Sequence, residues 1–232
     1  MRRGAKFIIY SVVALAVLAA GAIALYVFVI QDDPPPRVAL SSTTTTGGTG
    51  TAPASADGTW TVQQGESTFL GYRVNEKLAS LPSPSDAVGR TPAVEGTMTI
   101  AGSTVSAADV TGDLSQLESD QDRRDSRIRT SGLESDTFPE ATFTLTGPLD
   151  LGEVPEVGAE VNATASGDLT LHGVTKAVEV PLEARWSGET IEVIGTLDIV
   201  FADYDIDPPN IGGFVTVEDE GEMELQLTFV PA

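Results

Sequence analysis

The chain has 232 residues, of which 41% are hydrophobic and none is cysteine. This length suffices for one sizeable domain with accessory segments, and the lack of cysteine excludes disulfides, thiolate metal sites and a lipidated N-terminal cysteine. The formal net charge is −21, and beyond residue 57 there are 31 Asp and Glu against nine Lys and Arg. Such a negative field repels nucleic acid, so we expect no nucleic-acid partner.

An apolar run near the N-terminus predicts a membrane anchor. Residues 1–6 carry three basic side chains, and residues 7–30 carry no charge. As a helix this run would be about 36 Å long, which is enough to cross a hydrocarbon core of about 30 Å and exceeds the core of a signal peptide. Because basic residues precede the run and two aspartates follow it, we expect a single-pass anchor, residues 1–30, in the cell membrane, with a cytoplasmic N-terminus and an extracytoplasmic C-terminal domain.

Residues 31–57 predict a linker between this anchor and the rest of the chain. They contain three consecutive prolines, four consecutive threonines and a glycine pair. Such a composition is stiff at the prolines, flexible beyond them and poor in side chains that could form a core. The remaining residues, 58–232, form the one domain that we expect to fold.

Beyond residue 58 the chain alternates between apolar and polar residues, which is the period of half-buried β-strands. The clearest example is the hairpin 167–185, in which apolar residues share one parity on both sides of a polar turn at 172–176. About eight such strands in 175 residues predict an antiparallel barrel, because closure removes exposed edges. We expect residues 75–92 to be a loop. Small inward residues, such as Gly167 and Ala165, favour space inside the barrel.

One segment interrupts the alternation and predicts a short helix. Ser119 with Asp122 three residues later has the spacing of a capping box, and Gly132 can end the helix. Four of the nine basic residues of the domain fall between residues 123 and 129. They form either a solvated helix face or an anion-facing patch in an otherwise acidic domain.

Few residues can support acid–base or metal chemistry. His172 is the only histidine, and no serine lies in a G-x-S-x-G sequence, which argues against a nucleophilic hydrolase. A catalytic zinc ion would need histidine ligands that the chain lacks. We therefore expect a protein that is not an enzyme and that has no cofactor and no metal site.

Several short stretches, taken in order, resemble the YceI-like family of extracytoplasmic, lipocalin-like polyisoprenoid-binding proteins. They are residues 169–176 (LTLHGVTK), the pair Arg124-Asp125 with Ile128-Arg129, residues 139–143 (PEATF) and residues 201–204 (FADY). The resemblance covers Thr59 to about Val230. Residues 88–91 (VGRT) look like an actinobacterial, membrane-anchored branch of that family.

The resemblance implies an all-β fold, an eight-stranded antiparallel lipocalin-like barrel with a short helical excursion, around an apolar tunnel for an isoprenoid chain. The tail would contact inward residues that the alternation also selects, namely Tyr72, Met98, Ile100, Phe143, Leu145, Leu169, Leu171, Trp186, Ile199, Phe201, Leu225 and Leu227. A polar or anionic head group would meet Arg124, Asp125, Arg129 and His172.

Three functions follow as hypotheses. The first is a membrane-tethered protein of the cell envelope that binds a polyisoprenoid or similar long-chain lipid without chemistry; its partners are that lipid and the membrane, and a second copy of the chain is a further candidate. The second is a scaffold or adhesion module whose barrel is filled by side chains. The third is an enzyme on lipid precursors with Arg124, Asp125 and His172 as its polar site, and the shortage of acid–base groups makes it the weakest.

Overall fold

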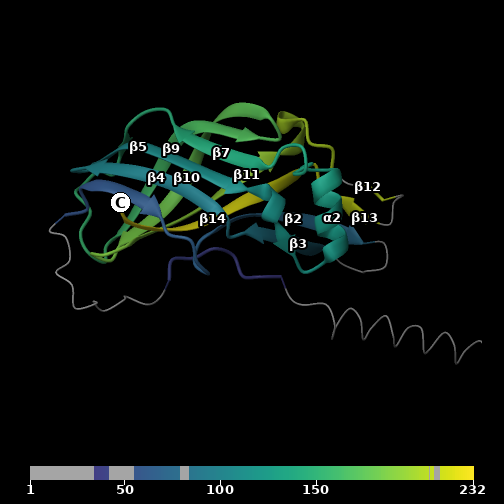
Figure 1. Ribbon diagram of the computed structural model, residues 1–232, viewed down its shortest axis with the longest axis horizontal. Coiled ribbons are helices and arrows are strands. Elements are labelled where there is room, and N and C mark those ends of the chain that lie inside the picture. The colour runs from purple at the N-terminus through teal and green to yellow at the C-terminus, as the bar shows by residue number, and fades with distance from the viewer. Residues whose placement is uncertain (1–33, 42–54, 79–83, 209, 212–214) are drawn as a thin grey trace, which may run out of the picture. The chain divides into compact units, whose positions relative to one another are not determined.

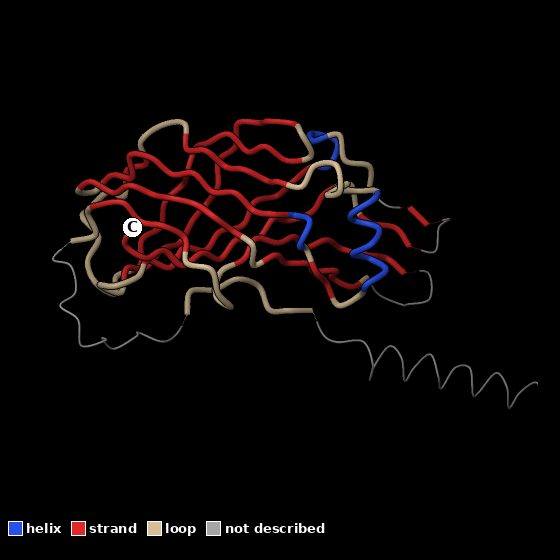
Figure 2. Tube along the Cα trace, in the orientation of Figure 1, coloured by secondary structure: helices blue, strands red, loops and turns tan. Residues whose placement is uncertain are grey.

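The computed structural model describes residues 34–41, 55–78, 84–208, 210–211 and 215–232. Pro36–Ala232 form one compact unit built almost entirely of β-strands (Figures 1 and 2). The strands are β1 (Gly58–Val62), β2 (Phe69–Leu78), β3 (Ser85–Thr91), β4 (Val94–Ala101), β5 (Thr104–Asp113), β6 (Glu118–Ser119), β7 (Glu140–Leu145), β8 (Leu149–Asp150), β9 (Glu160–Leu171), β10 (Val174–Trp186), β11 (Ile191–Val200), β12 (Asn210–Ile211), β13 (Val215–Val217) and β14 (Glu220–Pro231). The helical segments are η2 (Leu114–Gln116), α2 (Asp122–Thr130) and η3 (Phe201–Tyr204).

The predicted membrane anchor, residues 7–30, lies outside the described residues. In the part of the chain that the structure describes, no helix is long and apolar enough to span a bilayer. Of the predicted linker, residues 34–41 and 55–57 are described.

Eight strands close into an antiparallel barrel, as predicted. Their hydrogen-bonded order is β1-β4-β5-β7-β9-β10-β11-β14, and β14 pairs in turn with β1. The closing register places Trp60 opposite Pro231 and Val62 opposite Phe229. Because the first and last strands of the ring pair with each other, closure satisfies backbone groups that a sheet edge would expose.

The predicted loop at residues 75–92 was too long, because strands occupy most of this range. β2 runs on to Leu78, and β3 pairs with it from Leu70 opposite Thr91 to Glu76 opposite Ser85. The sequence of β3, SDAVGRT, lacks a clear apolar alternation, so its register is fixed by its partner strand. β2 itself pairs with residues Glu222–Gln226 of β14, and it therefore extends the wall beyond the end of β1.

The hairpin of β9 and β10 confirms the predicted alternation of faces. Its turn is shorter than predicted, because only His172 and Gly173 separate Leu171 from its paired partner Val174. Both turn residues have positive φ, 52° and 76°. Two positive-φ residues in a two-residue loop are the type I′ geometry, whose twist matches that of paired strands.

The helix begins three residues later than predicted. Ser119 belongs to β6, which pairs with Gly89 and Arg90 of β3, and α2 starts at Asp122. The capping-box prediction was therefore wrong: the residue before the helix is Gln121, and its side chain makes no cap hydrogen bond. Strand pairing holds the Ser119 backbone in β6, so the helix can start only beyond it.

A buried ion cluster lies on the outer face of the wall. The Glu224 carboxylate is fully buried and accepts from Nε of Arg73 at 2.6 Å and from Nη2 of Arg90 at 3.1 Å. Although burial lowers the pKa of Arg73, its hydrogen bond to Glu224 and the charge of that carboxylate outweigh burial and raise the pKa. The two guanidinium groups offset the cost of placing the carboxylate away from water.

A segment of the predicted linker contacts this outer face. We call residues 36–41 the strap. The carbonyl oxygen of Pro36 accepts from Nη2 of Arg90 at 2.9 Å. At the other end of the strap, the backbone NH and the hydroxyl of Ser41 donate to the Glu192 carboxylate at 3.0 and 2.7 Å.

The strap also accounts for an apolar residue on the outside of the barrel. Ile194 lies between the buried residues Val193 and Gly195, and its side chain has the opposite parity to theirs, yet it is only 4% exposed. Val38 of the strap lines the same outer groove as Ile194. The strap therefore shields a hydrophobic side chain that would otherwise meet water.

Replacing Glu224 by Gln tests the buried ion cluster. The change leaves two arginines beside a neutral amide, so we expect unfolding free energy to fall by about 3–5 kcal/mol, measured by urea unfolding. The control is Glu220→Gln, because Glu220 has the same parity on β14 and is exposed, and its effect should stay within about 0.5 kcal/mol. Equal effects of the two variants would contradict a structural role for the cluster.

Candidate functional site

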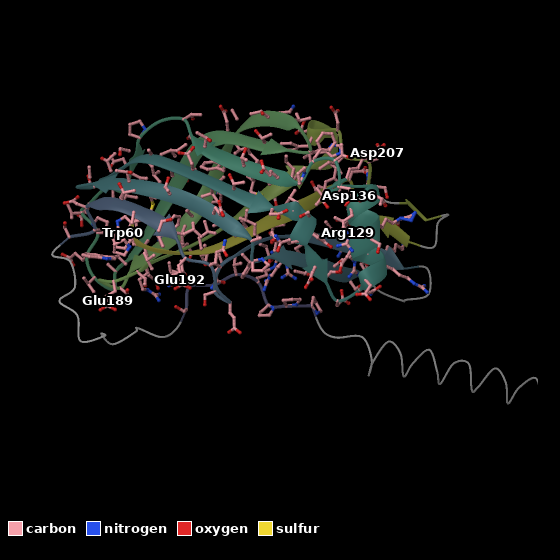
Figure 3. All side chains as sticks on the ribbon, viewed as in Figure 1. Trp60, Arg129, Asp136, Glu189, Glu192 and Asp207 are labelled. Atoms are coloured by element: carbon pink, nitrogen blue, oxygen red, sulfur yellow. The ribbon has the colours of Figure 1, made fainter. Side chains whose placement is uncertain are left out.

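Two clusters of buried apolar side chains occupy the inside of the barrel. One buried cluster contains Trp60 and Trp186 and lies where β14 ends. A second cluster contains Leu169, Leu171 and Tyr204, and Ile128 of α2 packs against it. Figure 3 shows Trp60 at the end of the barrel opposite α2. The axis of the barrel therefore runs from α2 to the two tryptophans.

Four cavities follow one another along this axis. We call them the mouth (about 340 Å³), the vestibule (about 70 Å³), the central cavity (about 100 Å³) and the end cavity (about 70 Å³). Each shares wall residues with the next: Phe201 joins mouth and vestibule, Met223 joins vestibule and central cavity, and Met98 joins central and end cavities. Side chains therefore separate neighbouring cavities within one barrel lumen.

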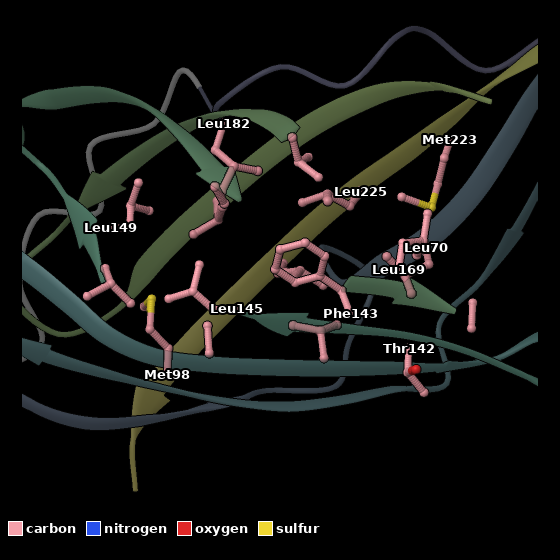
Figure 4. Close-up of a pocket in the computed structure, with 18 of the residues that line it drawn as sticks. Leu70, Met98, Thr142, Phe143, Leu145, Leu149, Leu169, Leu182, Met223 and Leu225 are labelled. Atoms are coloured by element: carbon pink, nitrogen blue, oxygen red, sulfur yellow. The ribbon is translucent and has the colours of Figure 1, made fainter. Parts of the chain in front are cut away.

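The central cavity is lined by apolar side chains, with Thr142 as the one polar residue in its wall. Figure 4 shows the Phe143 ring in the middle of this lining, between Leu145 and Leu225. A Cβ atom at Gly167 would lie 2.3 Å from Cζ of Phe143. Gly167 therefore admits the phenylalanine ring rather than leaving empty space.

The inward alanines agree with the prediction that small residues leave space inside the barrel, whereas the inward glycines do not. Three alanines line the central cavity, namely Ala108, Ala141 and Ala165. By contrast, a Cβ atom at Gly195 would lie 2.6 Å from a methyl group of Leu182. The side chains of neighbouring strands thus fill the room at the inward glycines.

The mouth lies between one face of α2 and the end of β2. Its helical wall consists of Arg123, Arg124, Arg127, Ile128 and Ser131. These positions have the i, i+1, i+4, i+5, i+8 spacing of a single helix face. Tyr72, Val74 and Glu76 of β2 and the apolar side chains of Phe201, Ile206, Leu133, Pro208 and Val217 complete the wall. The mouth is thus charged along α2 and apolar towards the vestibule.

Arg124 ties α2 to β2. Its Nη2 lies 3.0 Å from Oε2 of Glu76, and it also forms an ion pair with Asp120. Burial lowers the pKa of Arg124, but the hydrogen bonds to Glu76 and the charges of Glu76 and Asp120 outweigh burial, so the pKa is raised. The guanidinium is therefore charged at every pH at which the protein is folded, and it is already engaged by carboxylates.

The hydroxyl group of Tyr72 is buried beside the Ser119 side chain, and among the residues that the structure describes it makes no hydrogen bond of standard geometry. Burial raises the pKa of this phenol, and the charge of Arg124 opposes the shift only in part. The hydroxyl therefore keeps its proton at neutral pH. A ligand oxygen placed here would accept a hydrogen bond from this hydroxyl.

Asp125 stabilises the start of the helix and does not line the lumen. Its carboxylate is buried and accepts from the backbone NH of Ser119 at 3.0 Å and from the Ser119 hydroxyl at 2.6 Å. Each hydrogen bond to a carboxylate contributes about 1.5–3 kcal/mol. The residue holds β6 and α2 together across the turn that joins them.

His172 lies in the β9–β10 turn, at the end of the barrel near α2. Its Nδ1 donates to the carbonyl oxygen of Tyr204 at 3.0 Å, because a carbonyl can only accept. Its ring meets Phe138 edge to face at 4.5 Å, and Nε2 lies 3.5 Å from Oε2 of Glu134. Throughout the described ranges, no three His, Asp or Glu side chains are grouped to hold a metal ion.

The twelve residues predicted to contact a lipid tail all line at least one of the four cavities. The four residues predicted to meet a head group are dispersed instead. Arg124 lines the mouth, whereas Asp125, Arg129 and His172 line none of the four cavities. Figure 3 shows Arg129 on α2, and the wall of the mouth is formed by the neighbouring positions. Contact with a ligand stays a prediction for all sixteen.

The set of predicted site residues omits several side chains that line the mouth, although the arginines among them belong to the basic segment 123–129 noted in the sequence. Arg123 and Arg127 line the mouth together with Leu133 and Ile206. Helical spacing was the available signal, because residues 123 and 127 are i, i+4 neighbours, whereas residue 129 falls on a different face. No comparable signal existed for Ile206, since it follows η3 in an irregular segment.

Comparison with known proteins identifies the domain. A model of the YceI-like domain matches residues 60–229. The chain belongs to the YceI-like family. UPF0312 proteins of Vibrio parahaemolyticus and Vibrio vulnificus are 32% identical over 120 residues, which is 49% of this chain and 60% of the length of each relative. The match thus spans less than two thirds of these curated relatives.

Solved structures share the fold of this YceI-like chain. A polyisoprenoid-binding domain from Saccharophagus degradans, implicated in plant cell wall breakdown, aligns with a TM-score of 0.60 at 21% identity, over 75% of this chain and 98% of that domain. BcnA of Burkholderia cenocepacia aligns with a TM-score of 0.54 at 18% identity, over 72% and 98%. At these identities the likeness shows the lipocalin-like barrel fold.

Replacing Gly173 by Ala tests the turn beside the mouth. Gly173 has φ of +76°, and a Cβ atom would lie 2.9 Å from the Phe138 ring. We expect the variant to lose about 1–3 kcal/mol of stability, visible as a lower Tm. Gly147→Ala is the matched control, because a Cβ atom there meets nothing within 4 Å. A Tm equal to that of the unmodified chain would contradict the strained geometry of this turn.

Proposed function

We propose that this chain binds a polyisoprenoid or similar long-chain lipid inside its barrel and performs no chemistry on it. The observation that carries the proposal is the series of cavities that begins at the partly charged mouth and continues through three apolar cavities to the tryptophan end. A rod-shaped apolar ligand matches this shape, whereas a compact polar metabolite does not.

The energetics favour a long apolar occupant. Each methylene group moved from water into the lumen contributes about 0.8 kcal/mol, so a tail of several isoprene units exceeds the cost of ordering it. The Phe201 ring and the side chains of Met223 and Met98 separate the cavities, and they can make room by changing rotamer. The backbone of the closed barrel need not move.

Family membership supports the proposal. The Saccharophagus degradans domain with the same fold is described as polyisoprenoid-binding. The interior of the present chain offers no acid–base pair beside the central cavity, whose wall contains no ionisable side chain. Binding without turnover is therefore the function that this lumen supports best.

The proposal includes a location. The uncharged run at residues 7–30 and the basic residues before it support a membrane anchor with the barrel on the extracytoplasmic side. A lipid-binding barrel tethered there stays near the bilayer that supplies apolar ligands. This part of the proposal rests on sequence alone.

A scaffold whose barrel is filled by side chains is the second candidate function. The observation that favours it is the narrow lumen, since the three inner cavities measure only about 70–100 Å³ each. It predicts that no lipid accompanies the protein. The two candidates therefore differ in a measurable property.

Mass analysis of the full chain tests the proposal. The chain is purified in mild detergent from its native host and measured intact by native mass spectrometry, and bound material is then extracted with organic solvent. We expect an apolar molecule whose fragments are spaced by isoprene units. A ligand-free mass, together with no uptake of added polyprenol, would contradict lipid binding and favour the scaffold.

Ala108→Leu should block the central cavity. Ala108 lines this cavity, whereas Ala107, its neighbour on β5, is exposed. The leucine side chain would occupy space that the lipid tail needs, so we expect lipid affinity to fall by about tenfold or more. Ala107→Leu is the matched control and should bind as the unmodified chain does. Equal affinities of both variants, measured by titration with a fluorescent polyprenol, would contradict occupancy of the central cavity.

A further inference from the structure

We propose that the contact between His172 and Glu134 is a pH-sensitive latch of the mouth: protonation of the histidine ring strengthens the contact and slows the passage of lipid. This inference rests on the proposed function, because it concerns the rate at which the lumen takes up and releases its lipid. It goes beyond lipid binding, since it gives the entrance two states that differ by one proton.

Two irregular segments complete the walls of the mouth and the vestibule, and His172 contacts both. The first is the loop of residues 131–139 between α2 and β7, which contributes Leu133 to both cavities. The second is η3 with the residues after it, which contributes Phe201 and Ile206 to both cavities. Neither segment belongs to a strand, so local contacts help to fix their positions.

The two ring nitrogens of His172 face different segments. Nδ1 donates to the carbonyl oxygen of Tyr204 in η3 at 3.0 Å, so Nδ1 carries the proton of the neutral ring. Nε2 lies 3.5 Å from Oε2 of Glu134 in the loop. Among the described residues, Nε2 is buried and forms no hydrogen bond. One side chain therefore joins both irregular segments of the wall.

The neutral and the charged ring hold the loop differently. In the neutral ring the lone pair of Nε2 faces a carboxylate oxygen, and two acceptors cannot form a hydrogen bond. Protonation places an N–H and a positive charge at Nε2, which can then donate to Glu134 in a charge-assisted hydrogen bond. The bond from Nδ1 to Tyr204 persists, because both nitrogens of the charged ring are donors. Since histidine side chains change charge between about pH 5 and 8, acidification strengthens the link.

Glu134 transmits this link to the rest of the loop. Its carbonyl oxygen accepts from the backbone NH of Thr137 at 2.7 Å and from that of Phe138 at 2.9 Å. Its φ is +47°, which is uncommon for a residue other than glycine. The Phe138 ring in turn meets the His172 ring edge to face. Because Leu133 directly precedes Glu134, fixing the glutamate side chain also fixes the wall of the mouth.

Other charged side chains near this contact are exposed, and water and salt screen them. They are Lys176 on β10, Asp203, Asp205 and Asp207 in and after η3, and Asp136 and Glu140 in and after the loop. Within the described part of the chain, Glu134 is the one ionisable side chain that an ion pair joins to His172. The charge of the ring therefore acts mainly on Glu134.

The single histidine of the chain makes the latch directly observable. The full chain is labelled with ¹⁵N-histidine, purified in mild detergent without a histidine tag, and titrated by NMR, so its spectrum contains one imidazole. At pH 8 we expect the tautomer with the proton on Nδ1, and on acidification a single transition to the charged ring. A ring protonated at Nε2 at pH 8 would contradict the geometry on which the latch depends.

The rate of lipid release tests the function of the latch. A fluorescent polyprenol is loaded into the full chain, and its transfer to phosphatidylcholine vesicles is timed between pH 5 and 8. We expect release to be about fivefold slower at pH 5, with the same midpoint as the histidine titration. His172→Asn and Glu134→Gln should each reduce this dependence to less than about twofold. Asparagine tolerates positive φ and can still donate to Tyr204.

Asp136→Asn is the matched control, because Asp136 is exposed on the same loop, and it should keep the full pH dependence. A pH dependence that persists in His172→Asn, or whose midpoint differs from that of the ring, would overturn the latch and leave lipid binding intact.

Failure of the polyprenol to load would instead contradict the proposed function, and the latch then has a test without ligand. After correction for the intrinsic effect of pH on hydrogen exchange, the amides of Thr137 and Phe138 should exchange about threefold or more slowly at pH 5 than at pH 8. Equal protection at the two pH values would overturn the latch.

Discussion

The strand pairing of β14 is the constraint on which the rest of the structure depends. Along one edge it pairs with β11 over ten residues, and along the other it pairs with β1 and with β2. The contact with β1 closes the ring, and the contact with β2 extends the wall toward α2. Because every second side chain of β14 points inward, this register also divides the molecule: Leu225 and Leu227 face the lumen, and Glu224 faces the buried arginines outside. One strand thus fixes closure, the apolar lumen and the charged outer layer.

Much of this barrel could be predicted from the sequence because β alternation is a local pattern. The strands β9, β10, β11 and β14 carry it over ten residues or more, and the structure places them as predicted. β3 could not be predicted in this way, since its residues are placed by pairing with β2 rather than by their own pattern. The strap is a similar case, because nothing in the sequence of residues 36–41 indicates that they form hydrogen bonds with Arg90 and Glu192 on the barrel.

The same distinction between local sequence patterns and long-range pairing applies to the candidate site. The residues that line the inner cavities were predictable, since the inward parity of a strand is a property of the sequence alone. The charged mouth was predictable only as a composition, a group of arginines between residues 123 and 129. Which of them face the lumen depends on where α2 begins, and that depends on the pairing of Ser119 in β6. A shift of three residues rotates a helix face by most of a turn, so the arginines that line the mouth could not be identified beforehand.

The tryptophan end of the barrel has a consequence for ligand choice. Trp60 is 2% exposed and Trp186 is 5% exposed, and both pack in one buried cluster with Ala56. A lipid that enters beneath α2, as proposed, would therefore be stopped by these two side chains at the far end. A blind tube of this kind measures length: a chain that is too short leaves apolar space unfilled, and one that is too long cannot bring its polar end back to the entrance. For a lipid bound as proposed, the distance from the indoles to α2 would therefore set the length of chain that fits.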